Sequence, residues 1–273
     1  AGEFAPDLIR TFSYSHVRHP TSLRTSMSVS IATWNLDRAK QMWRRDELRA
    51  RMETIGAEIW VLTETRDSVS PGSGYRRVAT SAEGARGKND ERWVTIWTIL
   101  PDRGSRSTRD DEYATSALIT LPSGMVLAVY GTVLPWRGSV WRGTKSAGAA
   151  AYKAAIAVQA NDWSELCDAT DVDGVCVAGD FNQDLSDKPY YWSTAAKSLL
   201  LQSLRECGLI CATSGSNDPV RKLTGQTRAC IDHICLSQRV ASQQHGKPEA
   251  WAPIHQGRKL SDHPGVRLEL ADV

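Results

Sequence analysis

Short runs of apolar residues recur along the whole chain, and most of them are too short to form helices. Runs of this length that are rich in β-branched and aromatic residues predict buried β-strands. The clearest hairpin joins Ala114–Thr120 to Val126–Val133 through a Leu-Pro-Ser-Gly turn, in which proline presets the bend and glycine tolerates its backbone. We expect further strands at residues 30–35, 59–64, 75–79, 93–100, 175–182, 231–236 and 265–270.

A helical period is evident in fewer places. Apolar residues recur at helical spacing between Met42 and Ile55 and predict a helix over residues 38–55. Two more helices are predicted, over the alanine-rich residues 147–167 and over residues 191–207. Because strands outnumber helices and hairpins alternate with helical crossovers, we expect an α/β fold in which mixed sheets pack together with helices outside.

The composition of the chain indicates which class of protein it belongs to. With 273 residues, 41% hydrophobic and 23% charged, the chain is typical of a globular protein, and we expect one domain over residues 27–273 after a tail or leader of 1–26. It has no 18-residue apolar run and no apolar signal-peptide core, and its six cysteines lack zinc-site spacing. We therefore expect reduced thiols, no membrane partner and an intracellular, cytoplasmic location.

The net charge of +2 does not indicate a nucleic-acid partner, but the distribution of charge is uneven. Residues 113–161 contain no acidic side chain, whereas Arg137, Arg142 and Lys145 all lie within them. These cations, together with Trp136, could bind phosphate and unpaired bases, because aromatic rings stack on bases and guanidinium groups bind phosphate. A solvated cationic face and core tryptophans are the alternative interpretation.

Acidic and amide residues stand where we expect strands to end, which is where open sheets place their ligands. Carboxylates and carboxamides are the oxygen ligands that suit Mg²⁺ or Mn²⁺. The sequence therefore indicates a divalent-metal site for breaking phosphate esters. Its candidate residues are Asn35, Glu64, Asp180, Asn182, Asp232, Asp262 and His263.

Two pairs within this set suggest roles. Asp180 and Asn182 are two residues apart, so an extended segment places both side chains on one face, although Gly-Asp-Phe-Asn is equally typical of a turn. A lone histidine is more often structural, but Asp232 could orient His263 and favour its imidazolium form. The neighbouring His233 should point the opposite way along its strand and be structural.

The motifs occur in an order that resembles a known superfamily. Thr-Trp-Asn-Leu, Leu-Thr-Glu-Thr, Gly-Asp-Phe-Asn, Ile-Asp-His-Ile and Ser-Asp-His, spread over residues 31–270, are similar to the successive motifs of the endonuclease/exonuclease/phosphatase superfamily. That superfamily includes pancreatic-type deoxyribonucleases, abasic-site endonucleases, inositol-polyphosphate phosphatases and sphingomyelinases. The resemblance implies a four-layer α/β sandwich of two packed mixed sheets, with the site at one edge.

The resemblance also implies roles for the residues. Glu64 would bind Mg²⁺ or Mn²⁺, with Asn35 and Asp262 assisting. Asp180 would activate water and Asn182 would hold phosphate. Asp232 would support His263, whose cation would stabilise charge on phosphorus.

One position departs from the family pattern. The family usually places His or Tyr near the phosphate after the strand that contains Tyr130, and this chain has Val133 there. Valine cannot donate a proton, so Thr132, Tyr130, Arg137 or a metal-bound water would have to substitute.

We therefore expect a metal-dependent phosphodiester hydrolase, with DNA or RNA as the favoured substrate. A phosphatase or phosphodiesterase of small molecules, such as nucleotides or inositol phosphates, is the alternative. A non-catalytic binding module of the same fold is a further alternative, which the intact set of carboxylates disfavours. A lipid substrate is disfavoured because no amphipathic anchor stands out.

Overall fold

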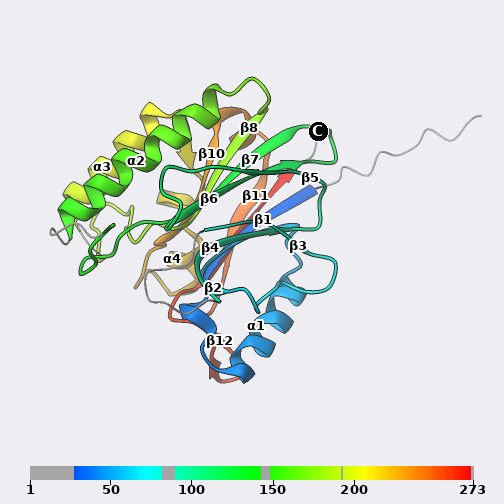
Figure 1. The fold of residues 1–273 in the computed structure, drawn as a ribbon. Coiled ribbons are helices and arrows are strands. Elements are labelled where there is room, and N and C mark those ends of the chain that lie inside the picture. The colour runs from blue at the N-terminus through cyan, green and yellow to red at the C-terminus, as the bar shows by residue number, and fades with distance from the viewer. Residues whose placement is uncertain (1–27, 82–89, 143–147, 192, 272–273) are drawn as a thin grey trace, which may run out of the picture.

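Two sheets of six strands each form the centre of the computed structural model, which describes residues 28–81, 90–142, 148–191 and 193–271 (Figure 1). The first sheet has the order β11 (Gln244–Trp251), β14 (Gly265–Ala271), β1 (Ser28–Asn35), β2 (Ile59–Arg66), β4 (Glu91–Thr98) and β3 (Arg76–Thr80). The second has the order β5 (Asp102–Arg106), β6 (Ala114–Thr120), β7 (Val126–Val133), β8 (Gly174–Asp180), β10 (Asp232–Ser237) and β9 (Leu209–Cys211).

Both sheets are mixed. The pairs β1–β2 and β7–β8 are parallel, and the other pairs in the two sheets are antiparallel. A separate two-stranded ribbon joins β12 (Ile254–His255) to β13 (Arg258–Lys259).

Helices cover the outer faces of the sheets. On the first sheet, α1 (Met42–Ile55) packs Leu48 and Met52 against tryptophans of the strands. On the second sheet, α2 (Ala149–Asp168) and α3 (Thr194–Glu206) lie side by side (Figure 1). The remaining helices are the short α4 (Pro219–Leu223) and α5 (Gln238–Ala241) and the 3₁₀ turns Asp37–Ala39 and Gly215–Asn217.

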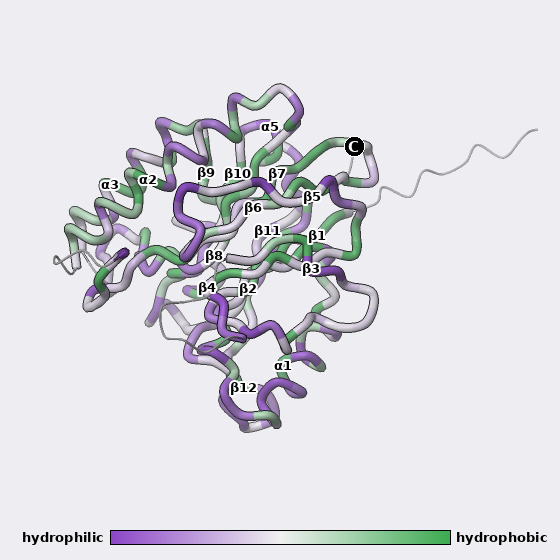
Figure 2. The backbone as a smooth tube through the Cα atoms, in the orientation of Figure 1, coloured by the Kyte–Doolittle hydropathy of each residue, from purple (hydrophilic) through white to green (hydrophobic). Residues whose placement is uncertain are grey.

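Apolar side chains from both sheets fill the space between them, and a second and third apolar layer lie under the helices. Figure 2 shows hydrophobic segments along the central strands and hydrophilic segments around β12 and the outer loops. The predicted four-layer α/β sandwich is therefore confirmed. None of the helices in the described part of the chain is long and apolar enough to cross a membrane.

The boundaries of two helices differ from the predictions. α1 begins at Met42 rather than residue 38, because Arg38 has a left-handed backbone (φ +62°) inside the 3₁₀ turn that precedes the helix. α3 begins at Thr194 rather than residue 191, because the Ser193 hydroxyl accepts a hydrogen bond from Ala196 N and caps the helix.

Three edge strands of the two sheets were not predicted. β5, β9 and β11 lie at the ends of their sheets, and their side chains are mostly exposed or half-buried. Such edge strands need no continuous apolar run, so their sequences lack the pattern that identifies the central strands.

Candidate active site

The predicted polar residues meet at one edge of the two sheets. Asn35 ends β1 and Glu64 lies near the end of β2, both in the first sheet. Asp180 ends β8 in the second sheet, and Asp232 lies opposite it at the start of β10. The site therefore spans the boundary between the sheets.

Our expectation that every cluster follows a strand was wrong for two of them. Asp232 is the first residue of β10, while Asp262 and His263 come just before β14. β10 runs antiparallel to β8, and β14 runs antiparallel to β1. Because the start of an antiparallel strand lies beside the end of its neighbour, the clusters still converge on one edge.

Asn35 connects the two sheets through its buried amide. Its Nδ2 atom donates to Asp180 Oδ2 at 2.9 Å and lies 3.3 Å from Glu64 Oε1. Its Oδ1 atom accepts a hydrogen bond from Asp37 N at 2.8 Å, which fixes the orientation of the amide. Asn35 thereby holds two carboxylates that would otherwise repel each other.

Two site residues have a strained backbone. Glu64 and Asn182 have φ values of +42° and +48°, in the left-handed region that non-glycine residues rarely adopt. Arg38 Nε lies 3.1 Å from Glu64 Oε2 and fixes the Glu64 side chain. Strain of this kind costs about 1–3 kcal/mol per residue and persists where the surrounding structure enforces it, commonly at functional sites.

Asp180 and Asn182 share a tight local network. The Asn182 backbone N donates to Asp180 Oδ1 at 2.9 Å, and its Nδ2 donates to Asp180 Oδ2 at 3.0 Å and to Leu134 O at 3.0 Å. In this arrangement Asn182 holds the Asp180 carboxylate. Burial, and then the negative charge of Asp232, raise the pKa of Asp180 to about 7, with His263 partly opposing the rise.

His263 and Asp232 form the second link between the sheets. His263 Nδ1 lies 2.6 Å from Asp232 Oδ2. The His263 backbone is fixed on both sides, since its O accepts from Trp34 Nε1 at 2.9 Å and its N donates to Ser261 Oγ at 3.1 Å. Burial alone would lower the pKa of His263, but the charges of Asp232 and Asp180 outweigh it and raise that pKa well above its ordinary value.

The neighbouring His233 faces the other way. It is fully buried, with Nδ1 3.1 Å from Thr213 Oγ1 and Nε2 3.0 Å from Gln183 O. Both ring nitrogens therefore have partners inside the protein, as a structural histidine requires.

The donor set fits a divalent cation. Potential ligand atoms of Asp180, Asp232 and His263 all lie within 4.8 Å of one another, and Glu64 joins this group through Asn35. Asp232 Oδ1 is buried without a hydrogen-bond partner among the described residues, which indicates a missing positive or donor group. Asp262 is exposed next to His263. Carboxylate oxygens of this kind suit Mg²⁺ or Mn²⁺. The Asn35 Oδ1 atom is instead engaged by Asp37 N, and the Asn35 Nδ2 atom faces the carboxylates.

Comparison with known proteins decides the family. The model of the Endonuclease/Exonuclease/phosphatase family matches residues 32–263. The chain belongs to this family. Membership confirms the predicted resemblance and the predicted class of reaction, the hydrolysis of phosphoesters. No curated protein matches the chain in sequence.

Solved structures of this family share the fold. The 3′ phosphatase NExo from Neisseria, bound to a product DNA hairpin, matches with a TM-score of 0.64 and 16% identity, over 89% of this chain and 99% of its own. An AP endonuclease from Leishmania major matches with a TM-score of 0.63 and 14% identity, over 95% and 92%. An AP endonuclease from Archaeoglobus fulgidus matches with a TM-score of 0.62 and 16% identity, over 90% and 100%.

Of the four residues predicted to bind substrate in this family member, the three that the structure describes have different surroundings. Trp136 is half-buried and packs beside Trp93, and Arg137 is exposed on the same loop. Arg142 Nε lies 3.1 Å from Oδ1 of the fully buried Asp110, so this guanidinium already neutralises a core carboxylate. Lys145 lies outside the described residues.

Val133 cannot donate a proton, and the two hydroxyl groups near it on β7 already have buried partners. Its side chain is buried between the sheets. The Tyr130 hydroxyl donates to Asp162 Oδ2 at 3.0 Å and the Thr132 hydroxyl donates to Gln159 Oε1 at 2.6 Å, both toward α2. Neither hydroxyl can therefore replace the usual His or Tyr without leaving its buried partner.

Tyr191 is the site residue that the sequence analysis missed. Its hydroxyl donates to Asn182 Oδ1 at 3.2 Å. Burial, and then the negative charges of Asp180, Asp262 and Glu64, raise the pKa of Tyr191 to about 12, so the phenol keeps its proton. The only signal in the sequence is a pair of tyrosines in the loop after Gly-Asp-Phe-Asn, and tyrosines in loops are common.

Asp232→Asn should lower the pKa of His263. The substitution removes the largest of the charges that raise this pKa and leaves the burial that lowers it, so the pKa should fall while Asp180 still opposes part of the fall. Titration of the His263 ring protons by NMR in metal-free protein measures the shift, with His263→Ala to assign the signal. Asp111→Asn, on an exposed carboxylate, is the control. An unchanged pKa in Asp232→Asn would show that another group sets the charge of His263.

Proposed function

We propose that this chain is a hydrolase of phosphodiester bonds that requires Mg²⁺ or Mn²⁺ and acts on DNA or RNA. The observation that carries the proposal is the convergence of Glu64, Asn35 and Asp180 with the Asp232–His263 pair, through hydrogen bonds that cross from one sheet to the other. Proteins of similar fold, among them a 3′ phosphatase bound to a DNA hairpin and two AP endonucleases, support a nucleic-acid substrate.

Each residue has a role that follows from its surroundings. Glu64 would hold the cation with help from Asp262, and the cation would neutralise charge on the phosphoryl oxygens. Asn35 would assist by positioning Glu64 and Asp180 through its Nδ2 atom, since its Oδ1 atom accepts from Asp37 N. Asp180 would accept a proton from the attacking water, since its raised pKa makes it a better base than an ordinary carboxylate. Asn182 keeps Asp180 in place. To hold a phosphate oxygen as well, its amide would have to release Leu134 O or Asp180 Oδ2, since both N–H groups are already donated.

His263 supplies positive charge on the other side of the phosphate. As an imidazolium it would stabilise the charge that grows on the phosphoryl oxygens during in-line attack. Asp232 keeps a proton on Nδ1 and so aims the other ring nitrogen, Nε2, away from itself and toward a substrate.

Tyr191 would take over the task that Val133 cannot perform. Its protonated phenol, hydrogen-bonded to Asn182, lines a hollow together with Asp262 and His263. Its one proton is donated to Asn182 Oδ1 at 3.2 Å, so the phenol would have to turn from Asn182 to the departing oxygen in order to replace the usual His or Tyr. Unlike the Tyr130 and Thr132 hydroxyls, it lines an open hollow and has room to turn.

Substitution of the two central carboxylates tests the proposal. Asp180→Asn and Glu64→Gln should each lower kcat/KM for a labelled oligonucleotide by about 10²- to 10⁴-fold, because one removes the base and the other the cation's main anchor. The rate should vanish with EDTA and return with Mg²⁺ or Mn²⁺. Asp46→Asn, an exposed position on α1, is the matched control and should keep full activity.

The substrate panel separates the alternatives. It should contain single- and double-stranded DNA, RNA, nucleotides and inositol phosphates. Faster turnover of small phosphomonoesters than of polynucleotides would contradict the nucleic-acid assignment. Retention of oligonucleotides without product, with or without metal, would indicate a binding module and overturn the enzymatic proposal.

Tyr191→Phe should slow the reaction according to the leaving group. An alkoxide leaving group, as in a dinucleotide, needs a hydrogen-bond donor, so kcat should fall by about tenfold or more. A p-nitrophenolate leaves without help and should be released at a nearly unchanged rate. Tyr190→Phe is the matched control, because that hydroxyl donates to Ala229 O instead. Equal losses on both substrates would mean that Tyr191 only positions Asn182.

A further inference from the structure

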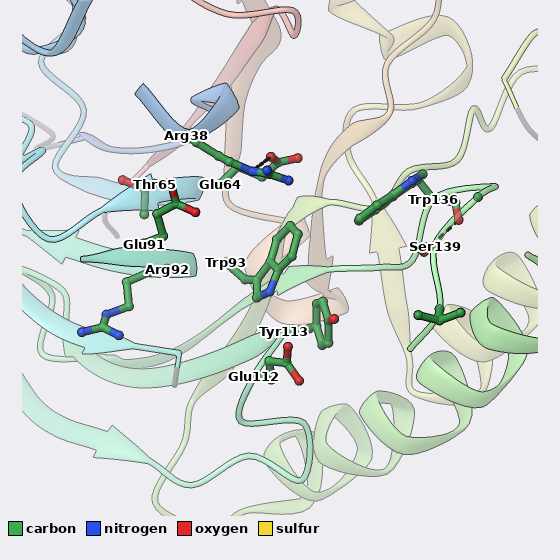
Figure 3. A pocket seen from close by; sticks show the side chains of 12 residues that line it. Arg38, Glu64, Thr65, Glu91, Arg92, Trp93, Glu112, Tyr113, Trp136 and Ser139 are labelled. Carbon is green, nitrogen blue, oxygen red and sulfur yellow. Dashed lines mark hydrogen bonds and ion pairs between the residues drawn. The ribbon is translucent and has the colours of Figure 1, made fainter. Parts of the chain in front are cut away.

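A cavity of about 270 Å³ opens beside the metal-binding edge, where Arg38 and Glu64 line it (Figure 3). Glu64 and Arg38 line both this cavity and the cluster of carboxylates, so the two spaces adjoin. The hollow that His263 lines is smaller and shares no lining residue with this cavity. A phosphodiester held at the carboxylates would therefore have one flanking group near the cavity that Glu64 lines.

Three aromatic rings form the wall of the larger cavity. The Trp93 ring lies 5.1 Å from the Tyr113 ring and 5.9 Å from the Trp136 ring, centroid to centroid. Arg38 Cζ lies 5.7 Å from the centroid of the Trp93 ring and covers it from the metal side. Figure 3 shows these side chains, which come from four separate segments, around one space. Flat surfaces of this kind favour a flat, aromatic ligand.

Hydrogen bonds fix the loop that carries Trp136. Ser139 donates from both its N and its Oγ to Trp136 O, at 3.0 and 2.9 Å. Further along, Trp141 Nε1 and Arg142 Nε both donate to the buried Asp110, at 3.0 and 3.1 Å. The aromatic wall is thus preorganised, which lowers the entropy that a ligand loses on binding.

Charge decides which part of a substrate this cavity can take. Three glutamates (Glu64, Glu91 and Glu112) and two arginines (Arg38 and Arg92) line it. Both arginines already pair with carboxylates, Arg38 with Glu64 and Arg92 with Asp67, so the cavity has no excess of positive charge to hold a phosphate group. An uncharged ring with N–H donors at its edge meets aromatic faces and carboxylate acceptors instead. The volume is near the lower end for ligand sites and suits a single ring system more than a long chain.

We infer that this cavity binds one unpaired nucleobase of the substrate, next to the phosphate that is cleaved, with Trp136 as the stacking wall. The inference rests on the proposed function and deepens it, because a base can enter only where it is not stacked in a duplex. The three aromatic residues of the cavity, Trp93, Tyr113 and Trp136, would then make the enzyme specific for single-stranded or frayed nucleic acid.

Removal of single bases tests the inference. Short single-stranded oligonucleotides in which a tetrahydrofuran abasic unit replaces one base at a time are compared by kcat/KM. In the native enzyme, loss of the base at one position beside the cleaved phosphate should lower kcat/KM by about tenfold or more. In Trp136→Ala the loss of that base should leave kcat/KM unchanged, because the ring on which the base stacks is already gone. Trp136→Phe keeps an aromatic ring and should keep the dependence on the base.

Trp43→Ala is the matched control, since Trp43 is an exposed tryptophan of α1. It should preserve the full base effect. The inference is overturned if Trp136→Ala slows abasic and normal strands equally, because the base effect would then equal that of the native enzyme.

A binding measurement separates failure of the cavity from failure of the enzymatic proposal. Fluorescence anisotropy of a labelled single strand with Asp180→Asn, with and without Trp136→Ala, does not require turnover. Tighter binding of the normal strand than of a fully abasic strand, lost in Trp136→Ala, supports the base site even if no substrate is hydrolysed. Equal binding of the two strands contradicts the base site even if hydrolysis is observed.

Discussion

Two hydrogen-bonded links between the sheets hold the site together. Asn35 of the first sheet binds Asp180 of the second, and Asp232 of the second binds His263, which enters the first. Either link would be costly to leave incomplete, because each contains a buried group that must be paired. The relative position of the two sheets and the arrangement of the reactive groups therefore depend on each other.

The balance of charge explains why the site can collect so many carboxylates. Asn35 donates to two of them, Arg38 contacts one, and the His263 cation lies against Asp232. One carboxylate oxygen, Asp232 Oδ1, still has no partner in the described part of the chain. A divalent cation would complete this balance, so metal binding and the raised pKa of Asp180 are two consequences of the same concentration of negative charge.

Most of the fold and much of the site could be predicted from the sequence, because central strands need continuous apolar runs and the site residues stand next to those runs. The edge strands β5, β9 and β11 could not be predicted, since β5 and β11 carry the polar residues that exposed edges tolerate and β9 is only three residues long. The ion pair of Arg142 could not be predicted either, because its partner Asp110 is distant in sequence. Tyr191 lies in a loop, where the direction of a side chain depends on tertiary contacts that no local pattern encodes.

The most direct test of this account is anomalous diffraction from crystals soaked in Mn²⁺. We predict one strong peak at the shared edge of the two sheets, within about 2.3 Å of a Glu64 carboxylate oxygen, a typical distance for such a cation and its oxygen ligands. The peak should be absent in Glu64→Gln. A peak elsewhere on the protein with none beside Glu64, or no peak at a concentration that supports hydrolysis, would contradict the account.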